Sequence, residues 1–179
     1  MDRVLILHDL PEGDAAALLP PGSGRFTLFA ASPSVRGCAG CFGCWIRTPA
    51  VCVIDDRCRG FAGCLPGHDG LLVISRAVFG GLSPDVKAVM DRSIGYLLPF
   101  FRYVGGEMHH ARRYGGPLWM RYVFYGGDIG ERERACARRL AAANAVNFGA
   151  ECRPVAFIRS CAEIKFADLT QDFFRHARR

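Results

Sequence analysis

Short apolar runs recur along the chain, each bounded by polar, glycine or proline residues. They occupy residues 4–8, 25–31, 70–75, 117–125 and 152–158. Strands of a parallel sheet are covered on both faces, so they read as continuous apolar runs of this length. These runs therefore predict five strands. Pro154 suits only the start or the edge of the last one, because proline donates no amide hydrogen bond.

Two segments between these runs have the periodicity of amphipathic helices. Ser83 is a favourable N-cap and Pro84 a favourable first residue for a helix that Pro99 ends. A longer helix is predicted from the turn at 126–128 to Gly149, a residue suited to the left-handed position after a helix. A last short helix is expected at the C-terminus. The apolar faces of the two main helices are predicted to be Val86, Val89, Met90, Ile94 and Leu97, and Ile129, Cys136, Leu140, Ala143 and Asn147.

The alternation of strands and helices predicts the fold class. It implies crossover connections and a parallel sheet with helices on both faces. With five strands, the expected fold is α/β, a flavodoxin-like three-layer sandwich with a five-stranded parallel sheet. The chain is long enough for one well-buried core, so residues 1–179 are expected to form a single flavodoxin-like domain. Residues 100–116 form a long excursion, and excursions of this length are often lids or interface arms.

Composition and charge narrow the class of protein. No apolar run approaches the roughly 20 residues needed to cross a bilayer. No export signal precedes the first strand, so we expect a cytoplasmic protein without a membrane partner. Nine cysteines in such a protein favour reduced thiols or metal ligands over disulfides. The net charge of +6 comes mostly from arginine and suits a solvated helix face or an anionic cofactor. Nucleic-acid binding is not predicted, because no basic, aromatic-rich recognition motif is present.

The order of several motifs is more specific than any of them alone. The pattern CxGCFxCW begins at Cys38, and TP and CVIDD follow it. After the third predicted strand come SxxVFGGLS, KxxxDR, GGEMHH and a GGD turn. In this order they resemble the NADPH-dependent FMN reductase family, near its iron–sulfur flavoprotein branch and the cluster-free relatives of that branch. The resemblance implies a flavodoxin-like fold, bound FMN, NAD(P)H as reductant, and a homodimer or homotetramer.

The resemblance also implies where the cofactor binds, at the carboxyl ends of the strands. Glycines suit this role because they let the backbone approach a flat ring closely. The flavin itself would carry the chemistry, so no catalytic side chain is assigned. By the family pattern, the isoalloxazine ring would contact Ser75, Arg76, Ala77, Val78, Phe79, Gly80 and Gly81, with a second flavin loop at Gly126, Gly127 and Asp128.

One loop departs from the family pattern. Family members usually carry a serine- and threonine-rich loop after the first strand, which holds the FMN phosphate at a helix start. Here residues 8–14 contain no serine or threonine. They do contain three acids, and they contain Pro11, which has no amide to donate. The phosphate is then held elsewhere, or flavin binding is weak, or flavin has been lost.

The cysteine loop at 38–52 has the spacing C-x2-C-x2-C-x7-C. The thiolates of Cys38, Cys41, Cys44 and Cys52 could converge on a [4Fe–4S] cluster. They could equally be structural or free thiols, with neighbouring aromatic residues filling a core or a dimer interface. A zinc site or a redox disulfide is the third interpretation.

Three functions follow from these patterns. The first is an FMN-dependent NAD(P)H oxidoreductase, a flavin or quinone-type reductase with a small-molecule or electron-carrier acceptor. The second is an iron–sulfur flavoprotein electron carrier, which the cysteine loop favours. The third is a flavodoxin-like binding subunit that has lost FMN, which the loop at 8–14 favours.

Overall fold

The centre of the protein is a parallel β-sheet. The computed structural model describes residues 2–19, 23–31, 34–116 and 118–165. The strand order is β2-β1-β3-β6-β7, and β8 also pairs with β6. This order is that of the flavodoxin-like fold, so the predicted fold class is confirmed. The strands are β1 (Val4–His8), β2 (Phe26–Ala30), β3 (Gly70–Arg76), β6 (Trp119–Tyr125), β7 (Glu151–Cys152) and β8 (Ala156–Ile158).

The outermost position of the sheet beside β6 is divided at Pro154. Arg153 N donates to Met120 O over 2.8 Å at the end of β7. Pro154 has no amide to donate, and pairing with β6 resumes only at Ala156, in β8. The predicted fifth strand is therefore present as two short strands, for the reason expected from its proline.

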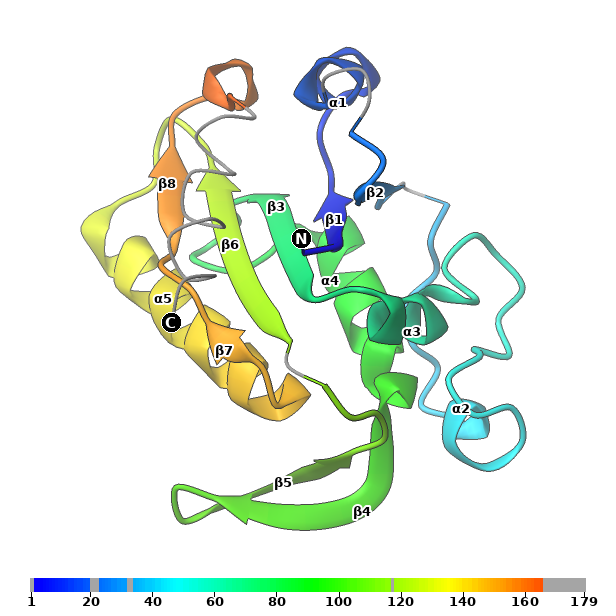
Figure 1. Cartoon of the computed structure of the whole chain (residues 1–179). Coiled ribbons are helices and arrows are strands. Elements are labelled where there is room, and N and C mark those ends of the chain that lie inside the picture. The colour runs from blue at the N-terminus through cyan, green and yellow to red at the C-terminus, as the bar shows by residue number, and fades with distance from the viewer. Residues whose placement is uncertain (1, 20–22, 32–33, 117, 166–179) are drawn as a thin grey trace.

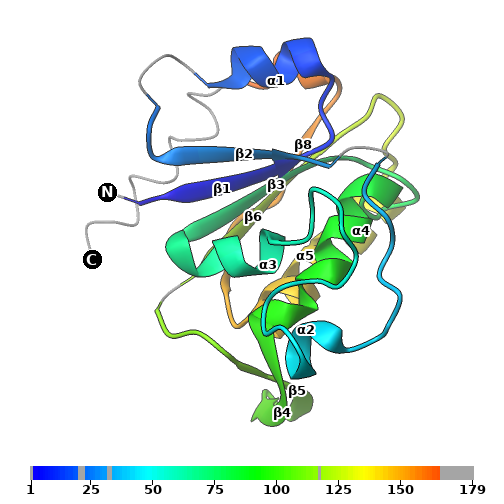
Figure 2. The same ribbon diagram turned by 90° about the vertical axis from the view of Figure 1, so that its right-hand side faces the viewer.

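Helices cover both faces of the sheet, which gives the expected three layers (Figure 2). On one face lies α1 (Glu12–Leu18), and on the other lie α3 (Phe61–Cys64), α4 (Pro84–Arg92) and α5 (Glu131–Phe148). The predicted C-terminal helix falls in residues 166–179, outside the described part of the chain. Within the described residues, no helix has the length and apolar character needed to span a membrane.

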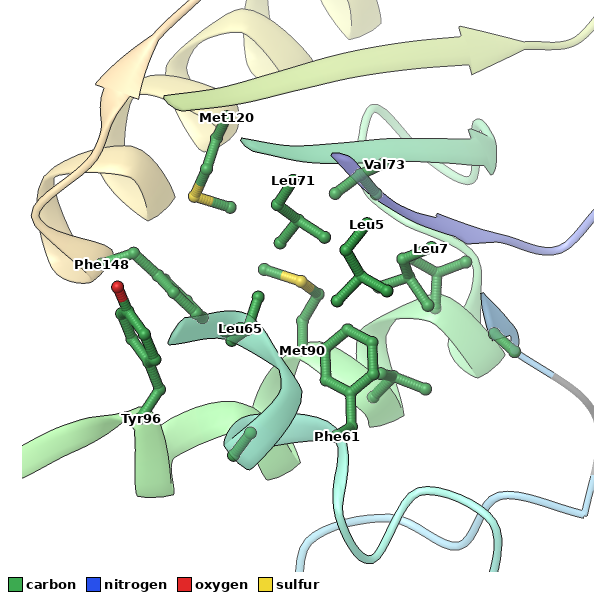
Figure 3. Packing of buried hydrophobic residues seen from close by; sticks show 14 of the residues in the cluster. Leu5, Leu7, Phe61, Leu65, Leu71, Val73, Met90, Tyr96, Met120 and Phe148 are labelled. Atoms are coloured by element: carbon green, nitrogen blue, oxygen red, sulfur yellow. The ribbon is translucent and has the colours of Figure 1, made fainter. Parts of the chain in front are cut away.

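Successive residues of the central strands face opposite layers. Leu5 and Leu71 belong to the core under α3, α4 and α5, whereas Ile6 and Leu72 belong to the core under α1. Figure 3 shows the first of these cores, where Phe61 of α3 lies close to the strand leucines. Two buried faces explain why the strands were visible as continuous apolar runs.

Helix α4 is shorter than predicted. It begins as expected, with the Ser83 hydroxyl accepting a hydrogen bond from Val86 N over 3.3 Å. It ends at Arg92, and a 3₁₀ turn, η2 (Ser93–Tyr96), follows. Leu97 was predicted on the apolar face of this helix but begins a strand. The aromatic residues after Leu97 favour a strand, and this preference outweighs the helical spacing.

The excursion predicted at 100–116 is largely a β-hairpin. Strands β4 (Leu97–Val104) and β5 (Glu107–Arg112) pair in antiparallel fashion. Gly105 (φ 59) and Gly106 (φ 86) join them with the positive φ angles of a type I′ turn. The hairpin extends away from the sheet at its amino edge (Figure 1).

Helix α5 packs on the sheet through small side chains. It ends as predicted at Gly149, which has a left-handed φ of 65°. Its predicted apolar face was wrong, because Cys136 and Ala143 are exposed. In so alanine-rich a helix the hydrophobic pattern is weak, and close approach to the sheet selects the face. The residues buried against the sheet are Ala137, Ala141, Ala145 and Phe148.

Candidate functional site

The carboxyl ends of β1, β3 and β6 meet at one edge of the sheet, because these strands are parallel neighbours. Three loops leave this edge: residues 9–11 after β1, residues 77–83 after β3, and residues 126–130 after β6 (Figure 1). The strand order reverses between β1 and β3, and open α/β sheets bind ligands at such a switch point. This edge is therefore the candidate functional site.

The loop after β3 contains a tight turn at residues 78–81. Val78 N donates to Gly81 O over 3.1 Å, and Gly81 N donates to Val78 O over 2.8 Å. Between them, Phe79 (φ 50) and Gly80 (φ 73) have the left-handed backbone of a type I′ turn. Phenylalanine rarely adopts that conformation, and here its side chain is 93% exposed. The fold thus holds an aromatic ring in solvent at the candidate site, at some cost in backbone energy.

Gly80 fixes this turn against α5. A Cβ at this position would lie 2.9 Å from Cys136 Cβ and 2.9 Å from Glu133 O. Both the space and the positive φ therefore require glycine. The turn at 78–81 and the first part of α5 are thus packed together. This packing positions the predicted flavin loop at 126–128, which leads into α5, relative to the turn.

Ser75 and Ala77 connect the same turn to its neighbours. The buried Ser75 hydroxyl donates to Arg76 O and accepts from Ser83 N, each over 2.9 Å. Ala77 N donates to Tyr125 O over 2.9 Å. The side chain of Ser75 is thus engaged inside the protein, where it positions the turn relative to the start of α4.

Four backbone amides at this edge have no hydrogen-bond partner within the described part of the chain. They belong to Phe79, Gly80, Gly127 and Asp128, all predicted site residues. Gly126 N, by contrast, donates to Ile158 O over 3.0 Å and ties its loop to β8. Phe79, Gly127 and Asp128 are exposed, so a ligand's carbonyl oxygens or ring nitrogens can accept from their amides, whereas Gly80 is buried against α5.

The loop after β1 is organised by Asp9, a residue that the sequence did not single out. Its two carboxylate oxygens accept from Arg76 N over 3.1 and 3.0 Å. Asp9 N donates to Ile74 O over 3.3 Å, and the Tyr125 hydroxyl donates to Asp9 O over 3.3 Å. Asp9 therefore ties the ends of β1, β3 and β6 together and spans the switch point itself.

This loop does not fit a phosphate group. The residue that precedes α1 is Pro11, which has no amide, and no side chain caps the helix. Glu12 and Asp14 place two further acids in the first turn. The first hydrogen bond of α1 runs from Ala15 N to Pro11 O, so the amides of residues 12–14 remain as donors, but the acids at 12 and 14 oppose the charge of a phosphate. Pro11 and the two acids thus lie at the start of α1, where the family pattern places the phosphate.

His8, at the end of β1, is buried beside this loop. Its Nδ1 accepts from Leu10 N over 3.3 Å. Burial lowers the pKa of His8; the Asp9 charge opposes this effect and the Arg57 charge adds to it. The imidazole is therefore neutral near pH 7 and adds no positive charge for an anion.

A groove of about 710 Å³ lies next to the turn at 78–81, between α4, α5 and the hairpin. Val78 lines one end and His110 of the hairpin lines another part, with Leu140 of α5 on the wall. Lys87 and Asp91 also line it, and they form an exposed ion pair with Nζ 2.5 Å from Oδ2. Its volume is in the range of small-molecule pockets.

The four cysteines of the predicted cluster motif line one small apolar cavity of about 110 Å³. Burial raises the pKa of the Cys44 thiol, and the neighbouring Cys52 and Cys38 raise it further. Even so, no group of three or more His, Cys, Asp or Glu side chains in the described ranges is arranged to hold a metal ion. The structure thus brings Cys38, Cys41, Cys44 and Cys52 near one another as free thiols, and it lends the [4Fe–4S] hypothesis no support.

A buried ion pair holds this cysteine segment, defined here as residues 36–59, against α4. Arg92 Nη1 lies 2.5 Å from Asp56 Oδ2, and the Arg92 side chain is 0% exposed. The same guanidinium donates to Arg36 O over 3.2 Å and to Ile54 O over 3.1 Å. The hydrogen bond from Arg92 is the largest cause that holds the pKa of Asp56 below its ordinary value. Arg92 and Asp56 were both visible, in the KxxxDR and CVIDD motifs, but their pairing across 36 residues was not.

An aromatic stack joins the cysteine segment to the hairpin. The rings of Phe42 and Trp45 stack with centroids 5.3 Å apart, and Trp45 lies 4.8 Å from His110. His110 in turn stacks on Phe101 at 4.9 Å. Phe42 and Phe101 are both exposed at the ends of this stack. The hairpin and the cysteine segment therefore present one continuous apolar surface.

Comparison with known proteins supports the fold. No protein-family model matches the chain, and no curated protein matches its sequence. Among solved structures, it is similar to general stress protein 14 of Treponema denticola in complex with FMN, with a TM-score of 0.51, 13% identity, and coverage of 98% of this chain and 94% of that chain. It is also similar to an NADPH-quinone reductase from P. pentosaceus, with a TM-score of 0.49, 12% identity, and coverage of 94% and 90%. The strand order and the similarity to the Treponema denticola protein together show an α/β protein of flavodoxin-like fold.

Proposed function

We propose that this protein is a flavin-dependent oxidoreductase of the FMN reductase type, with NAD(P)H as reductant. The observation that carries the proposal is that Phe79, Gly127 and Asp128 are exposed and have amides with no partner within the described chain. They lie at the edge where this fold binds its ligands, on loops that the family resemblance assigned to the flavin. The similar Treponema denticola protein was solved in complex with FMN, which supports a flavin as the ligand.

A bound flavin supplies the hydride and electron chemistry, so the protein has to bind, orient and shield it. The turn at 78–81 and the loop at 126–128 would hold the ring through backbone amides. Phe79, exposed at the tip of the turn, offers an aromatic face. The groove between α4 and α5 begins at Val78 and provides room for a small-molecule acceptor close to the ring.

We further propose that the protein assembles as a homodimer or homotetramer. Phe100, Phe101, Tyr103 and Met108 of the hairpin are all exposed. An isolated two-stranded hairpin is marginally stable in water, so burial of these side chains against a second copy would stabilise it. Sedimentation equilibrium would test this proposal, and a shift toward monomer in the double variant Phe101→Ser, Tyr103→Ser would support it.

A flavin titration of the purified chain, with NADPH oxidation measured on the same sample, tests the function. Gly127 has no atom within 4 Å of an added Cβ, so Gly127→Phe should fold and place a side chain in the ligand's space. Gly60→Phe is the matched control, since Gly60 is equally open but lies outside the site. We expect Gly127→Phe to weaken flavin binding at least tenfold and Gly60→Phe to leave it unchanged.

A second candidate function, a binding subunit without flavin, is favoured by the acidic loop after β1. If riboflavin, FMN and lumiflavin all fail to bind, the oxidoreductase proposal is wrong and this alternative stands. If flavin binds but Gly127→Phe has no effect, the function holds and the assigned loops are wrong.

A further inference from the structure

The loop after β1 is acidic, and its charge opposes that of the phosphate of FMN. In parallel α/β folds the first strand-to-helix turn is the usual place for a ligand's phosphate, because helix-start amides point at it. In this protein that turn carries Asp9, Pro11 and Glu12. The inference below rests on the proposed flavin function.

One acid of this turn, Asp9, is held in place by the backbone of the neighbouring strand β3. The Asp9 carboxylate accepts two hydrogen bonds from Arg76 N, at 3.1 and 3.0 Å, across the crevice between β1 and β3. Arg76 N is therefore not available to a phosphate oxygen. Glu12 and Asp14 add negative charge in the following turn of α1.

Two arginines lie near this loop. The Arg57 charge lowers the pKa of the buried His8, and Arg76 is exposed at the end of β3. Burial raises the pKa of Tyr125, which donates to Asp9 O, and the Asp9 charge raises it further. Arg76 lowers the pKa of the same hydroxyl by less.

We infer that this site selects a flavin that lacks the 5′-phosphate, so that riboflavin binds more tightly than FMN. A phosphate dianion would face the carboxylates of Asp9 and Glu12 at close range. The hydroxyl groups of a ribityl chain are neutral and can donate hydrogen bonds to those same carboxylates. The acids therefore disfavour FMN and suit riboflavin.

The test is a calorimetric titration of the full chain with riboflavin, FMN and lumiflavin at neutral pH and low salt. We expect riboflavin to bind at least tenfold more tightly than FMN. The ratio should shrink as salt is added, because salt screens the repulsion. This comparison needs no variant, so it stands even if a substitution fails to fold.

Asp9→Asn then assigns the selectivity to one side chain. Asparagine keeps a carbonyl oxygen for Arg76 N but removes the charge. We expect the ratio of riboflavin affinity to FMN affinity to fall at least fivefold, because the charge that repels the phosphate is removed. Asp69→Asn is the matched control, because Asp69 likewise accepts a backbone hydrogen bond, from Arg3 N over 2.7 Å, but at the opposite edge of the sheet.

The other outcomes separate this inference from the proposed function. FMN binding as tightly as riboflavin overturns the inference and leaves the function standing. A loss of FMN affinity alone in Arg76→Ala would show that an arginine holds the phosphate, which also overturns the inference. If none of the three flavins binds, the inference and the proposed function are both wrong, because the protein then has no flavin site.

Discussion

The central sheet and the cysteine segment at 36–59 are built on different principles. The sheet is held by many buried apolar side chains on two faces, each of which contributes a part. The cysteine segment has only one short helix, α2 (Gly43–Ile46), and one guanidinium group, Arg92, binds it at three points. The sheet can therefore lose one contact and keep its shape, whereas the loss of Arg92 removes three contacts of the segment at once.

The largest effect is expected from Arg92→Ala. Removal of the guanidinium leaves Asp56, whose side chain is 11% exposed, without its buried partner. We expect the free energy of unfolding to fall by about 4 kcal/mol, as measured by urea denaturation. Amide hydrogen exchange should accelerate most in residues 36–59.

The control for this variant is Arg59→Ala, which removes an exposed ion pair within the same segment. It should change the free energy of unfolding by less than about 0.5 kcal/mol. A similar loss in both variants would mean that Arg92 has no special role, and the contrast between the two regions would disappear.

Leu71→Ala should have a slightly smaller but more uniform effect. This fully buried side chain lies in the core under α3, α4 and α5. Its truncation should lower the free energy of unfolding by about 3 kcal/mol. Hydrogen exchange should accelerate evenly over the sheet, because the strands unfold together. A loss of protection confined to the residues around position 71 would contradict this view of the sheet.

Low pH should destabilise the cysteine segment before the sheet, without any substitution. The pKa of Asp56 is lowered in the folded protein, mainly by the hydrogen bond from Arg92. Asp56 therefore stabilises the fold above the ordinary carboxyl pKa of about 3.9, and this contribution is lost as the pH falls toward the folded value. We expect exchange in residues 36–59 to accelerate below about pH 4, before the sheet responds. In Asp56→Asn this pH dependence should vanish.

The smallest effect is expected from Lys87→Ala. The pair that Lys87 forms with Asp91 is exposed on α4, although its atoms are close. The free energy of unfolding should change by less than about 0.5 kcal/mol. A larger effect would show that the lining of the groove, and not only Arg92, stabilises α4.

Much of the fold could be predicted because it rests on local patterns. Strands buried on both faces can be recognised as apolar runs. Ser83 begins α4 and Gly149 ends α5 through local backbone chemistry. The hairpin was missed because Ile94 and Leu97 continue the spacing of α4, and only the aromatic residues beyond them indicate a strand. The buried face of α5 was missed because alanine carries little hydrophobic signal.

The candidate site was predictable only in part. The motifs placed the turn at 78–81 and the loop at 126–128, and the acids of residues 8–14 raised doubt about a phosphate. The contact between Asp9 and Arg76 joins residues 67 apart, and that between Arg92 and Asp56 joins residues 36 apart. Such pairs depend on the folded arrangement, and no single-sequence pattern indicates them.

The aromatic stack gives the protein a built-in optical contrast between its two regions. The chain contains two tryptophans. Trp45 lies in the cysteine segment against His110, and Trp119 lies in β6 with the Arg153 guanidinium 4.0 Å from its ring. Replacement of either tryptophan by phenylalanine would leave an indole whose fluorescence reports on one region alone. Detachment of the cysteine segment and unfolding of the sheet could then be followed separately in the same protein.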